Sequence, residues 1–208
     1  MLRMFVVACG LAACAYAQVE IGVVGGYGFS PKLTVKGPSG SADTGFRNGA
    51  VFGAFAGEDS YRYWSGEVRY LYRYSNLRLS AGSADVNFAA HTHLVTIDFL
   101  RHLRPREDRI RPFFVFGGGA KVIKGTGIES AAQPLGRLAA LTATSEVMPV
   151  ADGGFGVKVN VRKSVRVRFE VRDYVSRTPN KVIAPAPGAS FDGVLNDIVG
   201  SVAISFVR

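Results

Sequence analysis

Apolar and polar side chains alternate along five stretches of the chain, and this two-residue period constrains the fold more than any other feature. In residues 64–74, Trp64 and Val68 fall on one parity, whereas Glu67 and Arg69 fall on the other. Successive side chains of a β-strand point to opposite faces, whereas a helix would mix these two sets. The same alternation runs through residues 20–30, 154–161, 165–172 and 198–206. Each stretch is therefore predicted to be a strand with one apolar face.

Three further strands bring the expected total to eight. They are predicted at residues 46–57, 85–103 and 111–124, of which the first and last are apolar and glycine-rich, so their faces stay unassigned. The connections between strands alternate between long and short. The long ones are 31–45, 76–84, 125–148 and 178–193, and the short ones are 58–60, 104–109 and 162–164. An even number of antiparallel strands, with short turns at one end and long loops at the other, is typical of membrane barrels.

These features predict an all-β fold, namely an eight-stranded antiparallel transmembrane up-and-down β-barrel. The length of residues 64–74 agrees, because ten steps of about 3.3 Å, tilted by about 40°, span roughly 25 Å, the height of the apolar band of such barrels. Amphipathic aromatic side chains favour the two membrane interfaces. We expect the interface aromatics to be Trp64, Tyr72, Tyr74 and Phe206.

The first residues have the pattern of a secretory signal peptide. One positive charge, Arg3, precedes an apolar run that ends at the small-residue site Ala15-Tyr16-Ala17. We therefore predict a signal peptide at 1–17 and an outer-membrane β-barrel domain at 18–208. A lipoprotein-type site before Cys14 is the alternative, although it would leave a short apolar core. Cleavage after Ala17 removes both cysteines, Cys9 and Cys14, so we expect no disulfide and no cysteine metal site.

Composition excludes several other classes. No stretch after the leader has the roughly 18 consecutive apolar residues of a transmembrane helix. The net charge is +9, and removal of Arg3 leaves 24 basic against 16 acidic residues. These basic residues are spread along strands and turns and do not form one run, so no nucleic-acid partner is expected.

Alternation alone does not say which face points outward. A soluble lipocalin-like carrier of apolar ligands would have the same period with its apolar face inside. Small residues on the polar parity, such as Gly22, Gly154 and Ala203, fit the narrow interior of an eight-stranded barrel and favour an apolar outer face. Charges confined together inside must pair. The expected lumen charge network is Glu67, Arg69, Arg73, Asp98, Lys158, Arg168, Glu170 and Arg172. We predict a salt-bridged closed lumen and no open pore.

Residues with potential chemistry are few. His91 and His93 share a strand face and could together ligate a metal ion. However, no cysteine and no carboxylate stands at a suitable spacing nearby to complete a site. Together with Ser80, Ser83 or Asp85 they have the residue types of a lipid A-modifying barrel enzyme. Glycines 117–119 precede no helix with a Lys-Ser/Thr start, so they indicate strand packing and not a phosphate loop. We expect no catalytic residue, no cofactor and no metal.

Two weaker expectations concern single segments. His102 stands beside a short turn and is predicted to be an interface residue. Residues 131–144 are rich in alanine and leucine and could form a short helix in the third long loop.

The assembled features resemble the small eight-stranded outer-membrane β-barrel family, the outer membrane protein A or X type. Four segments carry the resemblance: Ala15-Tyr16-Ala17-Gln18, Val23 to Gly28, Arg111 to Gly119 and Phe169 to Tyr174. Within this family, the acidic and basic residues of the seventh strand point inward, which fits Glu170 with Arg168 and Arg172. The chain departs from the family at its end, where Arg208 replaces the terminal aromatic residue that the barrel-assembly machinery reads.

The resemblance implies location more than activity. It implies export through the periplasm to the bacterial outer membrane, contact with outer-membrane lipid and lipopolysaccharide, and the barrel-assembly machinery as a partner during insertion. The partner of the long loops stays undefined. The expected function is a non-catalytic, structural or anchoring barrel with loops for interaction. The alternatives are a lipid A-modifying enzyme and a lipocalin-like carrier.

Overall fold

A computed structural model describes residues 18–59, 61–130 and 133–208. Eight long strands close into one barrel. They are β1 (Val19–Phe29), β4 (Gly49–Glu58), β5 (Trp64–Tyr74), β8 (Ala90–His102), β9 (Ile110–Gly125), β11 (Ser145–Arg162), β12 (Val165–Ser176) and β15 (Leu195–Val207). The predicted signal peptide, 1–17, lies outside the described residues.

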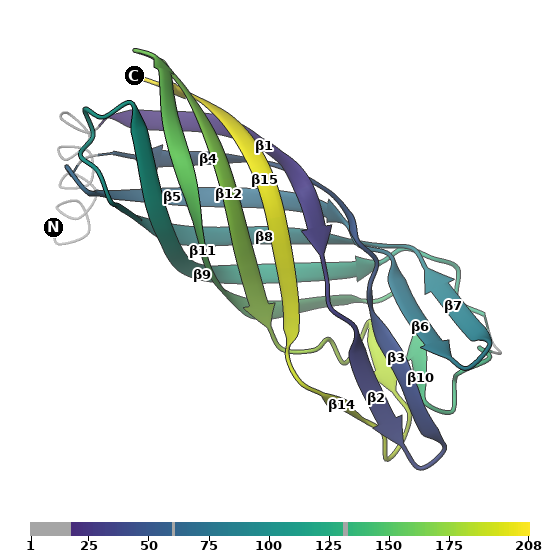
Figure 1. Cartoon of the computed structure of the whole chain (residues 1–208). Helices are drawn as coiled ribbons and strands as arrows, with labels where there is room; N and C mark the ends of the chain where they lie inside the picture. Colours follow the sequence, from purple (N-terminus) through teal and green to yellow (C-terminus); the bar gives the residue numbers. More distant parts are fainter. Residues whose placement is uncertain (1–17, 60, 131–132) are drawn as a thin grey trace, which may run out of the picture.

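The barrel has the up-and-down topology that the sequence predicts. Each barrel strand pairs antiparallel with its neighbour along the chain, and β1 pairs with β15 to close the ring, from Glu20 opposite Val207 to Phe29 opposite Ile198. Figure 1 shows the tilted strands as a continuous wall. Closure leaves no free sheet edge in the ring, which is the condition for a sheet to cross a bilayer.

The two ends of the barrel differ. At one end, where β1 begins and β15 ends, the strands are joined by short turns at 59–63, 103–109 and 163–164. We call this the short-turn end. The other end, the long-loop end, carries the four long connections, and Figure 1 shows their strands extending well beyond the barrel.

The long connections, predicted only as loops, form a second packed unit. Five short strands make a sheet in the order β14-β2-β3-β6-β7, and two more make a separate pair. The sheet comprises β2 (Leu33–Gly37), β3 (Gly40–Phe46), β6 (Leu77–Ala81), β7 (Ala84–Phe88) and β14 (Ser190–Asp192), and the pair comprises β10 (Ala139–Leu141) and β13 (Ile183–Pro185). We call these seven strands the outer cap. Val35, Leu77, Leu79, Leu141 and Ile183 are fully buried in its core.

Two segment predictions are wrong in this region. The strand expected at 85–103 is divided into β7 and β8, because the carbonyl of Ala89 accepts hydrogen bonds from the amides of Thr126 and Gly127 and leaves the ladder. The helix expected near 131–144 is absent from the described part of that segment, where a turn leads into β10. The side chain of Gln133 bonds both the N–H and the carbonyl of Leu141, which fixes this extended segment against β13.

The apolar parity of the barrel strands points outward. Ile97, Phe155 and Phe169 expose 61%, 60% and 52% of their surface. The predicted interface aromatics lie on this outer face, with Trp64 and Phe206 near the short-turn end and Tyr72 and Tyr74 near the long-loop end. Among the described residues, no helix is long and apolar enough to span a membrane.

The structure also assigns the two strands whose faces the sequence left open. In β4, Val51 and Phe55 point inward, while Phe52 points outward. In β9, the side chains of Arg111, Phe113, Val115, Lys121 and Ile123 are buried, whereas those of Phe114 and Phe116 are exposed.

Candidate functional site: the charged lumen

The middle of the barrel holds a cluster of seven charged side chains, which we call the middle cluster. Its members come from four strands because the inward parity of each strand carries charge at the same height. They are Glu67 and Arg69 of β5, Asp98 of β8, Asp152 of β11, and Arg168, Glu170 and Arg172 of β12. All are buried.

Arg172 has the largest number of acidic partners in this cluster. Its guanidinium lies 2.6 Å from Glu67, 2.5 Å from Asp98, 3.1 Å from Glu170 and 3.5 Å from Asp152. Arginine presents its donors in a rigid planar fork, so one side chain can serve several carboxylates at once. Arg172 therefore ties β12 to β5, β8 and β11 across the lumen.

Arg69 and Arg168 pair with the same two glutamates as Arg172. Arg69 bonds Glu170 and lies 2.9 Å from Glu67, and Arg168 lies 2.6 Å from the other oxygen of Glu67. Both guanidiniums also pack on the ring of Phe55, at 5.3 Å and 4.4 Å from its centroid. Cation–π contact and ion pairing together replace the water that these groups lose.

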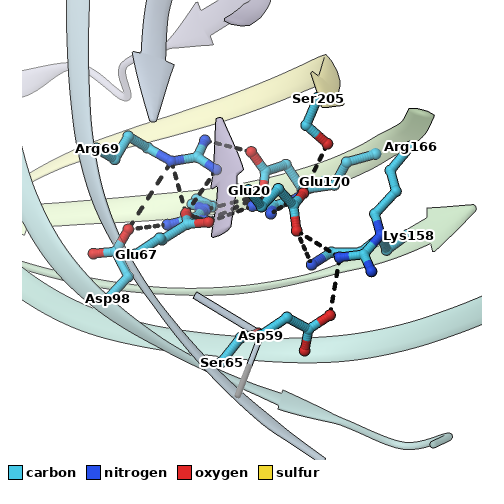
Figure 2. Close-up of polar contacts among 12 residues, drawn as sticks. Glu20, Asp59, Ser65, Glu67, Arg69, Asp98, Lys158, Arg166, Glu170 and Ser205 are labelled. Atoms are coloured by element: carbon cyan, nitrogen blue, oxygen red, sulfur yellow. Dashed lines mark hydrogen bonds and ion pairs between the residues drawn. The ribbon is translucent and has the colours of Figure 1, made fainter. Parts of the chain in front are cut away.

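A second group, the lower cluster, lies toward the short-turn end and joins the middle cluster through Arg168. Lys158 lies 2.8 Å from Glu20, and Arg166 bridges Glu20 and Asp59 at 2.9 Å to each. Arg111 completes the cluster at 2.6 Å from Asp59. Figure 2 shows residues of both clusters, among them Arg69, Glu20 and Asp59, joined in one chain of contacts.

A third group, the upper cluster, lies toward the long-loop end. Asp197 accepts hydrogen bonds from Lys121 and Ser30, and Arg73 lies 2.6 Å from it. The Lys121 amine also lies 3.4 Å from the Ser176 hydroxyl.

An apolar layer separates the upper cluster from the middle cluster. On β5, Leu71 stands between Arg69 and Arg73, and on β12, Tyr174 stands between Arg172 and Ser176. These side chains pack with Val24, Val51, Leu94, Val150 and Val199. The cavity beside this layer measures about 20 Å³, which is room for about one water molecule. The lumen is therefore filled by alternating ionic and apolar layers, with the outer cap beyond them.

All eight residues of the expected lumen network lie inside the barrel, seven of them in the middle and lower clusters and Arg73 in the upper cluster. Further buried charges, absent from the predicted network, complete the clusters. They are Glu20, Asp59, Arg111, Lys121, Asp152, Arg166 and Asp197. Glu20 and Arg166 stand on the charged parity of their strands, and this signal could have found them. Arg111 and Lys121 lie on β9, whose faces the sequence did not assign.

The three histidines lie in two different environments. His91 and His93 are on the outer face of β8, among the rings of Tyr70, Tyr72 and Tyr74, and His93 lies 2.8 Å from the Tyr70 hydroxyl. His102, expected at an interface, is instead fully buried, since it has the inward parity of β8 and lies 2.7 Å from the Ser65 hydroxyl. Across the residues that the structure describes, no group of three or more His, Cys, Asp or Glu is placed to hold a metal ion.

The histidines and the Ser or Asp residues that were candidates for a catalytic site contact other residues in the structure. Asp85 is paired with Arg78 at 3.0 Å in the outer cap, and Ser80 stands opposite Asp85 in the same sheet. The histidines contact tyrosines on the barrel wall. The carrier alternative also fails, because charges fill the described lumen and the large apolar side chains of the barrel face outward.

Comparison with known proteins supports the fold. No protein family and no curated protein matches the sequence. Solved structures do match. Neisserial surface protein A is 9% identical, with a TM-score of 0.56 over 90% of this chain and 96% of that one. OprG, an outer membrane protein of Pseudomonas aeruginosa, is 9% identical, with a TM-score of 0.51 over 93% and 97%. The outer membrane protease OmpT of Escherichia coli is 9% identical, with a TM-score of 0.51 over 93% and 98%.

At such identities the likeness concerns the fold. Three observations now agree, namely the closed ring of eight strands, the apolar outer face and the structural neighbours. In fold, the chain is a small eight-stranded β-barrel of the outer-membrane type.

Proposed function

We propose that the protein is a non-catalytic integral barrel of the bacterial outer membrane, with a closed lumen, that anchors the outer cap at the cell surface. The short-turn end then faces the periplasm and the long-loop end faces outward, which is the usual orientation of such barrels. Outer-membrane lipid and lipopolysaccharide surround the wall, and the barrel-assembly machinery inserts it.

The reversal of polarity between the two sides of the wall carries this proposal. Large apolar side chains such as Phe155 and Phe169 are half exposed, while Arg69 and Arg172 are 1% exposed. Soluble proteins rarely expose a contiguous apolar surface of more than a few hundred Å². A bilayer covers such a surface, and an arginine placed on it at mid-membrane would cost about 2–4 kcal/mol.

Insertion is tested by gel mobility with and without heating. The protein folded in detergent or lipid should migrate differently before and after boiling, as sealed barrels resist unfolding until heated. Identical mobility under conditions that give the full β-sheet circular dichroism signal would contradict the proposal.

The closed lumen is tested by conductance in planar bilayers. The ionic and apolar layers leave a cavity of only about 20 Å³ near the apolar layer, so we expect no steady channel. Leu71→Gly is the variant for comparison, since it removes a buried side chain of the apolar layer and keeps every charge. A steady large conductance in the unmodified protein would refute the closed lumen, whatever the variant does.

The absence of catalysis is part of the proposal. OmpT is named a protease, and the enzyme alternative from the sequence was lipid A modification. In this chain the candidate histidines contact tyrosines, and Asp85 is engaged by Arg78. We expect neither peptide cleavage nor lipid A acylation, and His91→Ala with His93→Ala should match the unmodified protein in both assays. Activity that disappears in this double variant would refute the proposal.

The outer cap is the part that meets external partners. Its strands are hydrogen-bonded to one another, and its core continues into the long-loop end of the barrel through Ile123, Met148 and Leu195. The extracellular segments are thus held as a rigid platform and not as free loops. Limited proteolysis of intact cells should leave β2, β3 and β6 uncut.

A further inference from the structure

A groove runs along the outer wall at the short-turn end, between β4, β5 and β8. Its volume is about 770 Å³, and its walls include Ala56, Trp64, Val68, Ile97 and Phe99. This volume lies within the range of about 300–1,000 Å³ of small-molecule sites. The side chains that line it on the outer face are mostly apolar, and Glu58 is the exposed charged residue of the lining.

The groove exists because one outward position lacks a side chain. Gly66 lies directly opposite Phe99 on β8, and a Cβ at Gly66 would meet only the Asp98 carbonyl oxygen, at 4.0 Å. The walls beside this gap are ordered by ring contacts. Trp64 packs edge to face on Phe116 at 6.1 Å, and Phe99 stacks on Phe116 at 5.9 Å.

Positive charge lies beside the groove at the short-turn end, next to the lining residue Trp64. Arg101 is directly opposite Trp64 in the register, next below Phe99 on the outer face, and its guanidinium lies over the rings of Trp64 and Tyr63 at 5.2 Å and 5.1 Å. Arg62 follows on the adjoining turn, 5.5 Å from the ring of Tyr63. The turn between β8 and β9 adds three further arginines, Arg104, Arg106 and Arg109, together with Glu107 and Asp108.

We propose that this groove binds one acyl chain of an anionic glycerophospholipid from the periplasmic leaflet, with the lipid phosphate at Arg101 and Arg62. The inference rests on the proposed membrane location. The apolar groove begins at the membrane interface and ends near the middle of the barrel wall, so it fits a hydrocarbon chain. The arginines fit the lipid phosphate, which lies at the depth of the interface. The aromatic residues that line its short-turn end, Tyr61 and Trp64, match that depth too.

Trp64 makes the site measurable, because it is the single tryptophan of the chain and forms one wall of the groove. The protein is folded into phosphatidylcholine vesicles that contain a small fraction of phosphatidylglycerol with brominated acyl chains. Bromine quenches the fluorescence of Trp64 on contact. Competition between brominated and unbrominated lipid gives the relative association constant of each headgroup.

We expect brominated phosphatidylglycerol to be preferred over brominated phosphatidylcholine. Because one basic residue near a membrane surface is worth about fivefold in affinity for an anionic lipid, Arg101→Gln should remove about that factor, and Arg101→Lys should retain most of it. Arg162→Gln is the matched control, since it removes an exposed arginine at the short-turn end of β11, a strand that does not line the groove. Equal loss in the two glutamine variants, or no preference in the unmodified protein, would overturn the proposal.

The groove itself is tested by filling it. Gly66→Leu should displace the bound lipid, as measured by native mass spectrometry of the protein after partial removal of lipid. Gly200→Leu is the control, because Gly200 is an outward glycine of β15 at which an added Cβ would meet no atom within 4 Å. Equal lipid retention by the two leucine variants would refute the groove as the site.

The membrane proposal and the lipid site fail in different ways. Uniformly brominated phosphatidylcholine should quench Trp64 in every variant if the barrel is embedded. Quenching without headgroup preference overturns the lipid site alone, whereas absence of quenching overturns the membrane location.

Discussion

Replacing Arg172 by methionine should be the most damaging single change in the lumen. Methionine keeps much of the length of the side chain but removes the charge and every donor. Arg172 serves four carboxylates, those of Glu67, Glu170, Asp98 and Asp152. Breaking a buried ion pair by removing one partner is strongly destabilising, because the other charge stays buried and unpaired.

The magnitude follows from the partners that remain. Glu67 keeps Arg69 and Arg168, and Glu170 keeps Arg69. Asp98 is left with Arg69 at 4.0 Å, beyond hydrogen-bond distance. Two carboxylates, Asp98 and Asp152, thus lose their principal donor. At about 1.5–3 kcal/mol for each hydrogen bond to a charged group, the loss is about 3–6 kcal/mol, which agrees with about 3–5 kcal/mol for a broken buried pair.

The assay is equilibrium unfolding in urea from lipid vesicles, followed by the fluorescence of Trp64. Arg172→Met should lower the free energy of unfolding by the amount just derived. Val171→Met is the matched control, since it places the same side chain on the lipid-facing side of the same strand, and it should change stability by less than about 1 kcal/mol.

The double variant Arg172→Met with Asp98→Asn tests the cause of the loss. It removes one of the two unpaired charges, so it should recover about 1–3 kcal/mol relative to Arg172→Met alone. A single variant that unfolds within about 1 kcal/mol of the unmodified protein, or a double variant whose losses simply add, would refute the reasoning.

Three further predictions concern the turn, the wall and the outer cap. Burial alone would raise the pKa of Asp59, but Lys158 and Arg111 lower it by more, so the net shift is downward. The stability that Asp59 contributes should therefore be present above the ordinary pKa of about 4 and lost as pH falls through the lowered pKa. Asp59→Asn should abolish that part of the acid dependence of stability. Phe169→Arg should cost about 2–4 kcal/mol in vesicles, because it places a charge on the lipid-facing wall. Leu79→Ala should cost the outer cap about 2–5 kcal/mol, seen as faster amide exchange in β3 and β6 than in barrel strands.

Each of these has a result that counts against it. An acid transition that is unchanged in Asp59→Asn would place the titration elsewhere. Ile128→Arg is the control for the wall, since Ile128 is 96% exposed in a long connection, and an equal loss there would deny a lipid environment to Phe169. Exchange that rises equally in the barrel strands after Leu79→Ala would show that the outer cap does not unfold as a separate unit.

The barrel was predictable because its signal is local. Two-residue alternation is set within each strand, and the sorting of connections by length follows from the order of strands along the chain. The two predicted strand bounds at Trp64 and Tyr74 are those of β5. The same reasoning left β4 and β9 unassigned, because large apolar residues and glycines occur on both parities of these strands, and only the ring as a whole decides that Phe55 points inward.

The upper cluster and the outer cap could not be found in this way. Asp197 and Lys121 belong to strands that are far apart in sequence, and their contact depends on the shear of the closed ring. The outer cap is built from strands of three to seven residues, too short for a convincing period. Leu33 and Val35, with Leu77 and Leu79, did repeat every second residue, and this was the signal that the polar composition of the loops concealed.

Glycine explains how so many long charged side chains fit in one narrow lumen. Across the strand pairs, Gly154 stands opposite Arg172, Gly156 opposite Glu170, Gly117 opposite Asp98 and Gly57 opposite Glu67. A Cβ at Gly156 would lie 2.7 Å from the ring of Phe113 and 2.8 Å from the Cβ of Glu170, which is closer than side-chain carbons approach. Each large residue therefore occupies the volume that its glycine partner leaves empty. This complementarity is a property of paired strands. A sequence read strand by strand shows charges and glycines on the same inward parity, and only the register shows which glycine stands opposite which charged residue.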